Sequence, residues 1–181
     1  MSNNRGITLI EMVAVIVVLG VSIPFLMTMW ADTAWRSARS ESLVDGAFYA
    51  QQLMEEIKTK RFDENLASPW SSSLGPDTST LGLNGTTNET STGRDNWDDV
   101  DDFSGYSGSP AAGYNSCVTV DYVSLGGTTW SGTCSPSNPT TCTKPTCASA
   151  NRTNYKRIIV RVWRTDNVLS DISLVTMVSG Y

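Results

Sequence analysis

The residue types available for chemistry restrict the functional classes to which this chain can belong. Its 181 residues include no histidine, which removes the usual acid–base group at neutral pH and the commonest metal ligand. No Ser-His-Asp or Cys-His nucleophile system can therefore form. Carboxylates and lysines are present, but no catalytic motif or phosphate-binding loop accompanies them. We expect a protein that is not an enzyme and has no cofactor.

The densest group of potential ligands is an aspartate-rich segment at residues 94–106. Hard oxygen ligands at this density can hold Ca²⁺, but the glycine and the distal glutamate of an EF-hand loop are missing. We therefore favour a solvated acidic turn without a metal, anchored to a folded head by the aromatic residues among the aspartates. The candidate ligands are Asp95, Asp98, Asp99, Asp101 and Asp102, and the interleaved aromatics are Trp97, Phe103 and Tyr106.

Four cysteines lie in the C-terminal half of the chain, namely Cys117, Cys134, Cys142 and Cys147. An even number in a Ser/Thr/Gly-rich region predicts disulfides and hence an oxidising compartment. Zinc ribbons need close Cys-x₂-Cys pairs, which are absent here. Four cysteines allow three connectivities, and sequence alone does not choose among them. The pairing that we expect is Cys117–Cys134 with Cys142–Cys147.

The charge balance argues against a nucleic-acid partner. The chain has 13 basic and 18 acidic residues, a net charge of −5, whereas nucleic-acid-binding proteins normally show a basic patch.

An uncharged apolar run covers residues 12–30. In a helix it would span about 28 Å, close to the hydrocarbon core of a bilayer. Arg5 precedes it and favours a cytoplasmic N-terminus. The run is too long for a cleaved secretory signal, and no A-x-A site follows it. A plain single-pass anchor fits the length but leaves Glu11 unexplained, since an intramembrane charge costs about 2.5–3.5 kcal/mol.

The residues around Glu11 resemble the prepilin signature, a short basic leader that ends in glycine and precedes an uninterrupted hydrophobic helix. Residues 5–12 read Arg-Gly-Ile-Thr-Leu-Ile-Glu-Met, with the glutamate fifth after the scissile bond. The resemblance implies cleavage between Gly6 and Ile7 by a prepilin peptidase, followed by N-methylation of the new Ile7 amine. The family often has Phe where Ile7 stands, and Ile is an accepted variant.

Glu11 then has a physical role in assembly. An unpaired carboxylate is costly in an apolar filament core, but one that faces the Ile7 amine of a neighbouring subunit is largely compensated. We expect Glu11 to set the register between packed helices. Pro24, inside the apolar run, removes one backbone hydrogen bond and should kink or loosen the helix.

Beyond the apolar run, the sequence predicts that the helix continues with one apolar face. We assign residues 1–6 to the leader, 7–30 to the transmembrane or filament-core helix, and 31–64 to its amphipathic continuation. The apolar stripe recurs at four- and three-residue steps through Leu43, Ala47, Ala50, Met54 and Ile57.

The remaining chain predicts a small β head. Residues 65–116, rich in Ser, Thr and Gly, read as a loop that contains the aspartate-rich segment, and residues 117–181 as an antiparallel sheet with disulfides. Residues 117–125, 155–164 and 168–178 have strand patterns, and the last two should form an antiparallel hairpin. The expected fold class is α+β, with a long N-terminal helix packed against a small sheet, as the pilin resemblance also implies.

The residues at 49–57 and the aspartate-rich segment are similar to minor pilins, the latter to those of the mannose-sensitive hemagglutinin type. The resemblance implies a minor type IV pilin; a pseudopilin of a type II secretion system and a non-polymerising membrane-anchored adhesive module are the alternatives. The implied partners are other pilin subunits through the N-terminal helix, the prepilin peptidase and the inner-membrane assembly platform. The implied location is the bacterial inner membrane, with a cytoplasmic N-terminus and a periplasmic head, and then the extracellular pilus.

Overall fold

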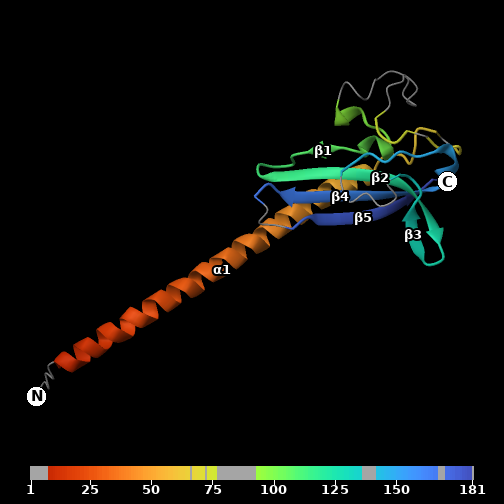
Figure 1. The fold of residues 1–181 in the computed structure, drawn as a ribbon. Coiled ribbons are helices and arrows are strands. Elements are labelled where there is room, and N and C mark those ends of the chain that lie inside the picture. The colour runs from red at the N-terminus through yellow and green to blue at the C-terminus, as the bar shows by residue number, and fades with distance from the viewer. Residues whose placement is uncertain are drawn as a thin grey trace, which may run out of the picture. The chain divides into compact units, whose positions relative to one another are not determined.

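The structure is a computed structural model that describes residues 8–65, 67–71, 73–76, 93–135, 142–166 and 170–180. The chain divides into two compact units, Met1–Ser42 and Leu43–Tyr181, and we describe each by itself. One helix, α1 (Leu9–Lys58), begins in the first unit and ends in the second (Figure 1). Residues 77–92 of the predicted loop lie outside the described ranges.

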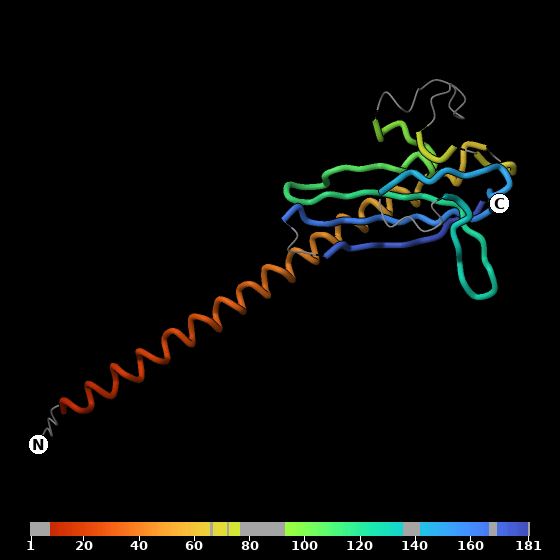
Figure 2. The backbone as a smooth tube through the Cα atoms, viewed as in Figure 1, coloured from red at the N-terminus to blue at the C-terminus, as the bar shows by residue number. Residues whose placement is uncertain are grey.

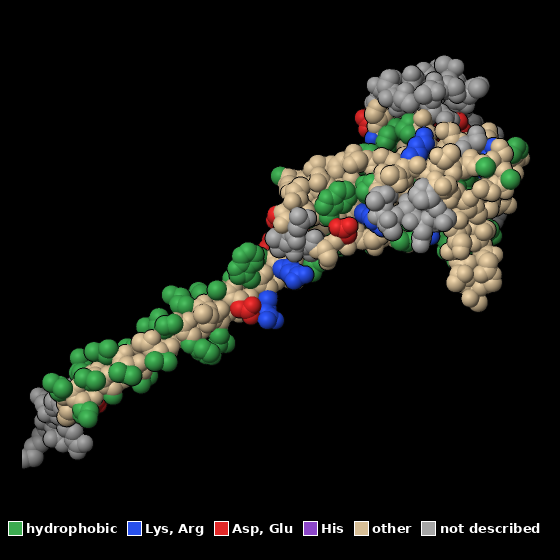
Figure 3. All heavy atoms as spheres, viewed as in Figure 1, with side chains coloured by type: hydrophobic (Ala, Val, Ile, Leu, Met, Phe, Trp, Pro, Cys, Tyr) green, Lys and Arg blue, Asp and Glu red, His purple; other side chains and the backbone are tan. Residues whose placement is uncertain are grey.

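The described part of the first unit is helical from Leu9 onward (Figure 2), and its large apolar side chains are exposed. Between Leu9 and Trp30 every large apolar side chain has an exposed fraction of 49% to 83%, and Figure 3 shows these side chains along the helix. The helix is long and apolar enough to cross a membrane, with a mean hydropathy of 2.6 over its most apolar window. It continues without interruption through Pro24, so the predicted kink does not break it.

The second unit, which we call the head, contains an antiparallel sheet in the order β1-β2-β4-β5, with β3 paired to β2. The long central strands β2 (Tyr114–Gly126) and β4 (Tyr155–Arg164) pair along nine residues of each, and β4 pairs in turn with β5 (Ile172–Ser179). The short strands are β1 (Ser107–Gly108) and β3 (Thr129–Gly132). The sheet and the long helix confirm the predicted α+β class, and the predicted hairpin of the last two strands is present.

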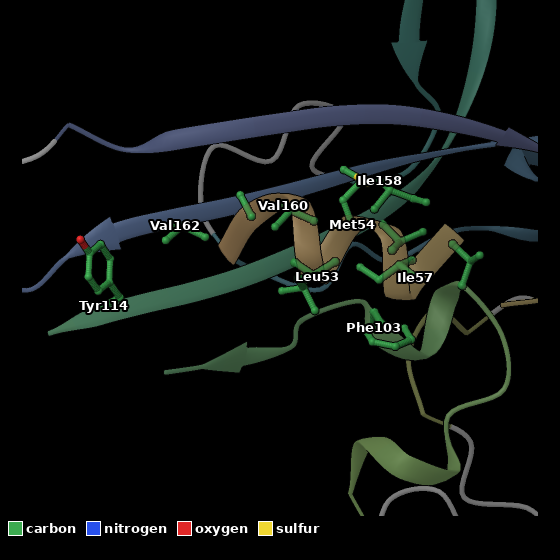
Figure 4. Close-up of a cluster of buried hydrophobic side chains, with 12 residues drawn as sticks. Leu53, Met54, Ile57, Phe103, Tyr114, Ile158, Val160 and Val162 are labelled. Carbon is green, nitrogen blue, oxygen red and sulfur yellow. The ribbon is translucent and has the colours of Figure 1, made fainter. Parts of the chain in front are cut away.

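The core of the head lies between the end of α1 and one face of this sheet. Figure 4 shows side chains from α1, η2 (Asp101–Phe103), β2 and β4 that converge there. The fully buried members include Ala50, Ile57, Phe103, Ile158 and Val160.

The predicted apolar stripe of α1 is correct only at its C-terminal end. Leu43 is 41% exposed and Ala47 is exposed, so these two assignments were wrong. The buried helix face instead includes Gly46 and Leu53 together with the correctly predicted residues from Ala50 onward. Residues on one helical face recur at either three- or four-residue steps. Near Leu43 the prediction chose the positions next to the buried ones.

Two predicted boundaries also differ from the structure. The helix ends at Lys58, not at residue 64, because the chain turns there to place Asp63 in the interior of the head, where it is 3% exposed. The head does not begin at residue 117: β2 starts at Tyr114, and Val100 and Phe103 are buried core residues. The third predicted strand begins in the structure at Ile172, and residues 168–169 lie outside the described ranges.

Both disulfides form, but the expected pairing was wrong. The bonds join Cys117 to Cys142 and Cys134 to Cys147, with Cα–Cα distances of 5.7 Å and 4.5 Å. The Thr133 amide donates to the Tyr122 carbonyl at 2.8 Å, so Cys134 lies near that part of β2. Cys117 is five residues away along the same strand, roughly 16 Å at about 3.3 Å per residue. That distance is too long for a disulfide.

Reduction of the disulfides should lower the thermal stability of the head. A bond that closes a loop of this size stabilises by roughly 3 kcal/mol because it restricts the unfolded chain. Thermal unfolding of the full chain in detergent, followed by circular dichroism with and without a thiol reductant, measures the change. Non-reducing peptide mapping should find the Cys117–Cys142 and Cys134–Cys147 peptides. An unchanged unfolding midpoint, or four titratable thiols in untreated protein, would contradict this prediction.

Candidate functional sites at the N-terminus and in the head

The predicted processing residues Gly6 and Ile7 lie outside the described residues. The described chain starts immediately after them, and α1 follows from Leu9. Glu11 is exposed in the first turn of α1, where its amide donates to the Thr8 carbonyl at 3.1 Å. An acidic side chain is favourable at this end of a helix because it meets the positive end of the helix dipole. The predicted register role of Glu11 involves a second subunit and stays a prediction.

The aspartate-rich segment is not the solvated turn that we predicted. Asp99, Asp101 and Asp102 are only 1%, 3% and 2% exposed. The segment enters the head because backbone bonds hold it there: the Arg61 amide donates to the Asp98 carbonyl at 3.2 Å, and the Val100 amide donates to the Arg61 carbonyl at 2.9 Å.

The predicted aromatic anchoring is present. Phe103 is fully buried, and Trp97 packs edge-on against both Phe103 and Tyr106, with ring centroids 4.9 Å and 5.6 Å apart.

Two of the buried aspartates organise the backbone of their own segment. Oδ1 of Asp99 accepts from the amides of Asp101 and Asp102 at 2.8 Å and 3.1 Å. Oδ2 of Asp102 accepts from the amides of Asp98 and Asp99 at 3.0 Å and 3.2 Å. Short-range bonds of this kind hold aspartate-rich turns together, so these oxygens are already used within the segment.

The five candidate calcium ligands are therefore not brought together as one site. Asp95 is exposed on η1 (Arg94–Asn96), while Asp101 points to a lysine. Among the described residues, Asp98 and Asp99 lie with Glu64 in a group whose ligand oxygens are within 4.8 Å of one another. Clusters of acidic groups are common without an ion, and we predict no metal here.

The central residue of the head's charged interior is Lys156 on β4, which is fully buried. Its Nζ donates to Oδ2 of Asp63 at 2.9 Å, to the Phe62 carbonyl at 2.6 Å, and to Oδ1 of Asp101, with which it is in direct contact. The ammonium also lies over two aromatic rings, 4.5 Å from the Phe62 centroid and 5.2 Å from that of Tyr122. All three ammonium protons therefore have acceptors.

Asp63 is the most fully hydrogen-bonded carboxylate of this group. Besides Lys156, it accepts from the Tyr122 hydroxyl at 3.0 Å, from the Asn65 amide at 3.0 Å, and from both the amide and the hydroxyl of Ser71. Burial by itself would raise the pKa of Asp63, but the charge of Lys156 and these hydrogen bonds outweigh burial, and the pKa is lowered. Asp63 is therefore ionised at neutral pH.

The other two carboxyl groups are shifted in the opposite direction. Burial, reinforced by the neighbouring Asp101 and Asp102 charges, raises the pKa of Asp99 to about 10. Burial also raises the pKa of Asp101, although Lys156 opposes the shift. The Asp101 amide donates to Oδ1 of Asp99 at 2.8 Å, so Asp99 holds its proton close to the Asp101 carboxyl group.

Lys156 itself keeps its charge. Burial alone would lower its pKa, but Asp101, Asp63 and Asp99 together raise it. The result is an ammonium between one firmly ionised aspartate and a pair of aspartates that share a proton.

Neither Lys156 nor Asp63 was predicted from the sequence. A signal for Lys156 was present, because the lysine stands two residues before Ile158 and so belongs to the inward-facing row of β4 with Ile158, Val160 and Val162. A lysine in an apolar row predicts a buried partner. Asp63 carries no comparable pattern, since it follows the helix in an irregular segment.

The free energy of unfolding should decrease as the pH rises between about pH 5 and pH 9. Folded Asp99 keeps its proton up to a pKa of about 10, whereas the unfolded chain releases it near 3.8. The stabilising contribution of Asp99 is therefore complete below pH 3.8. It is lost progressively as the pH rises toward the pKa of Asp99 in the folded state. Asp63 acts in the opposite direction only below 3.8, and Lys156 contributes a change only above 10.5.

Denaturant unfolding of the full chain at several pH values in this range measures how the free energy of unfolding changes with pH. The expected slope is up to about 1.4 kcal/mol per pH unit for each proton released. Asp99→Asn should flatten it, because Asn retains an oxygen acceptor for the two amides but does not titrate. Asp95→Asn, at an exposed position, is the matched control and should leave the slope unchanged. A slope that is the same in Asp99→Asn and in the unmodified protein would refute the assignment.

The comparisons with known proteins bear on the N-terminal site. Residues 1–23 match the model of the prokaryotic N-terminal methylation motif. Searches of curated proteins and of solved structures found no match. The match and the exposed apolar helix that it overlaps support a membrane-anchored, structural protein similar to type IV pilins and pseudopilins.

Proposed function

We propose that this chain is a minor type IV pilin, a structural and assembly subunit of a bacterial pilus. The observation that carries the proposal is that the methylation motif matched at residues 1–23 includes the start of an apolar helix, whose large apolar side chains stay exposed through Trp30. A prepilin peptidase would cleave between Gly6 and Ile7, and the new Ile7 amine would be methylated.

The exposed helix supports assembly as well as anchoring. Large apolar side chains cover Leu9–Trp30, and in water such a surface would be strongly unfavourable. Lipid covers this apolar surface before assembly, and the helices of other subunits cover it in a filament. Lipid does not explain Glu11, because a carboxylate at the mouth of the span gains from a cationic partner. The amine of a neighbouring processed subunit is such a partner.

The proposed topology follows from the same residues. The N-terminus lies in the cytoplasm, where the inner-membrane assembly platform engages the subunit, and the head lies in the periplasm and later on the pilus. The two disulfides support an oxidising compartment for the head. A pseudopilin of a type II secretion system would share every one of these features. A non-polymerising adhesive module would share the anchor but not the processing.

Gly6→Ala should block removal of the leader. The prepilin signature has glycine immediately before the scissile bond, and alanine adds a Cβ there, so the variant should keep its first six residues and an unmethylated N-terminus. Mass spectrometry of the N-terminal peptide from membrane-extracted protein measures both changes, and Gly20→Ala is a control within the same helix, where a Cβ meets no neighbouring atom within 4 Å. An unmodified protein that already carries an intact leader in cells with an active peptidase would refute the proposal.

Glu11→Ala should insert in the membrane but fail to enter filaments. Removal of the carboxylate leaves the span more apolar and leaves the neighbouring amine without its partner. Membrane fractionation and immunodetection in sheared filaments separate the two steps. Glu41→Ala, which removes an exposed carboxylate farther along α1, should assemble normally. Normal incorporation of Glu11→Ala would overturn the register role.

A further inference from the structure

Lys156 and its two carboxyl neighbours hold the components of a condensation reaction. Nζ of Lys156 contacts Oδ1 of Asp101 and lies 2.9 Å from Oδ2 of Asp63. The side chains of Lys156 and Asp63 are 0% exposed, and that of Asp101 is 4% exposed. An amine and a carboxyl group held in contact inside a fold need no encounter, and such proximity alone accelerates reactions by many orders of magnitude.

We propose that Lys156 and Asp101 join in an intramolecular isopeptide bond, between Nζ of the lysine and Cγ of the aspartate. The net reaction converts an ammonium and a carboxylate into a neutral amide and one molecule of water. It requires no oxidant, reductant or cofactor. The inference does not depend on the proposed pilus function, because it concerns only the interior of the head.

The flanking carboxyl groups are placed to make the proton transfers that this reaction needs. Lys156 must lose a proton before it can act as a nucleophile, and the ionised Asp63, hydrogen-bonded to Nζ at 2.9 Å, is the base positioned to take it. Asp99 carries a proton, and its carboxyl group lies beside Asp101, whose amide donates to Oδ1 of Asp99 at 2.8 Å. Transfer of that proton to Asp101 produces a neutral carboxylic acid, which an amine attacks far more readily than a carboxylate.

The proton balance then closes within the cluster. The amine attacks Cγ of Asp101, and the nitrogen of the tetrahedral intermediate returns a proton to Asp99. The intermediate collapses as the hydroxyl leaves with the proton that Asp63 had taken from the lysine. The C–N bond forms, one C–O bond breaks, and water departs. Asp99 ends protonated and Asp63 ends ionised, as both began.

The surroundings favour the neutral product. The rings of Phe62 and Tyr122 flank Nζ, and a buried charge pair is costly to keep out of water even when it is well paired. The amide removes two of the buried charges, and the remaining Asp63 carboxylate keeps its hydrogen bonds from Tyr122, Asn65 and Ser71. The bond would tie η2 to β4 across 55 residues of sequence and would survive reduction of both disulfides.

The head also contains an internal control pair. Arg157 on β4 donates to Oδ2 of Asp121 on β2 at 2.7 Å, and Asp121 is fully buried. A guanidinium is not a nucleophile at any pH that a protein tolerates, because it stays protonated. This pair has similar burial and contact but cannot condense.

Mass spectrometry of the full chain, purified in detergent, reduced and denatured, tests the proposal. We expect the mass to be lower than that of the corresponding uncondensed chain by one water molecule. A tryptic digest should contain a branched peptide joining the Lys156 and Asp101 segments, with no cleavage after Lys156. A full-mass chain that trypsin cuts after Lys156 would overturn the proposal, and this measurement requires no variant.

Variants test the assignment of roles. Asp101→Ala and Lys156→Arg should each abolish the branched peptide, whereas Asp121→Asn should retain it. Asp63→Asn should slow or prevent bond formation in chains that still show native near-ultraviolet circular dichroism. A branch that ends on Asp63, or one that persists in Asp101→Ala, would overturn the choice of Asp101.

Discussion

An ammonium group in a protein interior is costly unless other groups replace its water. Lys156 is in this position, and the loss of one partner from a buried pair typically costs about 3–5 kcal/mol. The groups that surround it come from three separate parts of the chain: Phe62 and Asp63 after α1, Asp101 in η2, and the Tyr122 ring on β2. The requirements of one side chain therefore determine where the helix exit, the aspartate-rich segment and β4 meet.

The aspartate-rich segment acquires its structural role from this arrangement. A run of acidic residues is normally solvated, because the buried charges would repel one another. Here the lysine compensates part of the charge, the backbone amides bind Asp99 and Asp102, and Asp99 retains a proton. The segment can then contribute Val100 and Phe103 to the core, which a solvated turn could not do.

The two parts of the continuous helix α1 have different surroundings and different roles. From Leu9 to Trp30 its apolar side chains are exposed in the isolated chain and need lipid or other helices. From Ala50 to Ile57 one face is buried within the head, and the opposite face stays polar. The first part is suited to a membrane and to assembly with other helices, whereas the second packs against the sheet of the head.

Local patterns in the sequence determined much of this protein. Periodicity predicted the helix, the α+β class and the β4–β5 hairpin, because these depend on residues close in the chain. The N-terminal motif is contiguous and was recognisable for the same reason. Cysteine pairing, the burial of Asp99 and Asp101, and the partners of Lys156 were decided only by tertiary structure. Each depends on which distant segments meet: the path of β2 separates Cys117 from Cys134, and the chain after α1 carries Asp63 to a lysine 93 residues away.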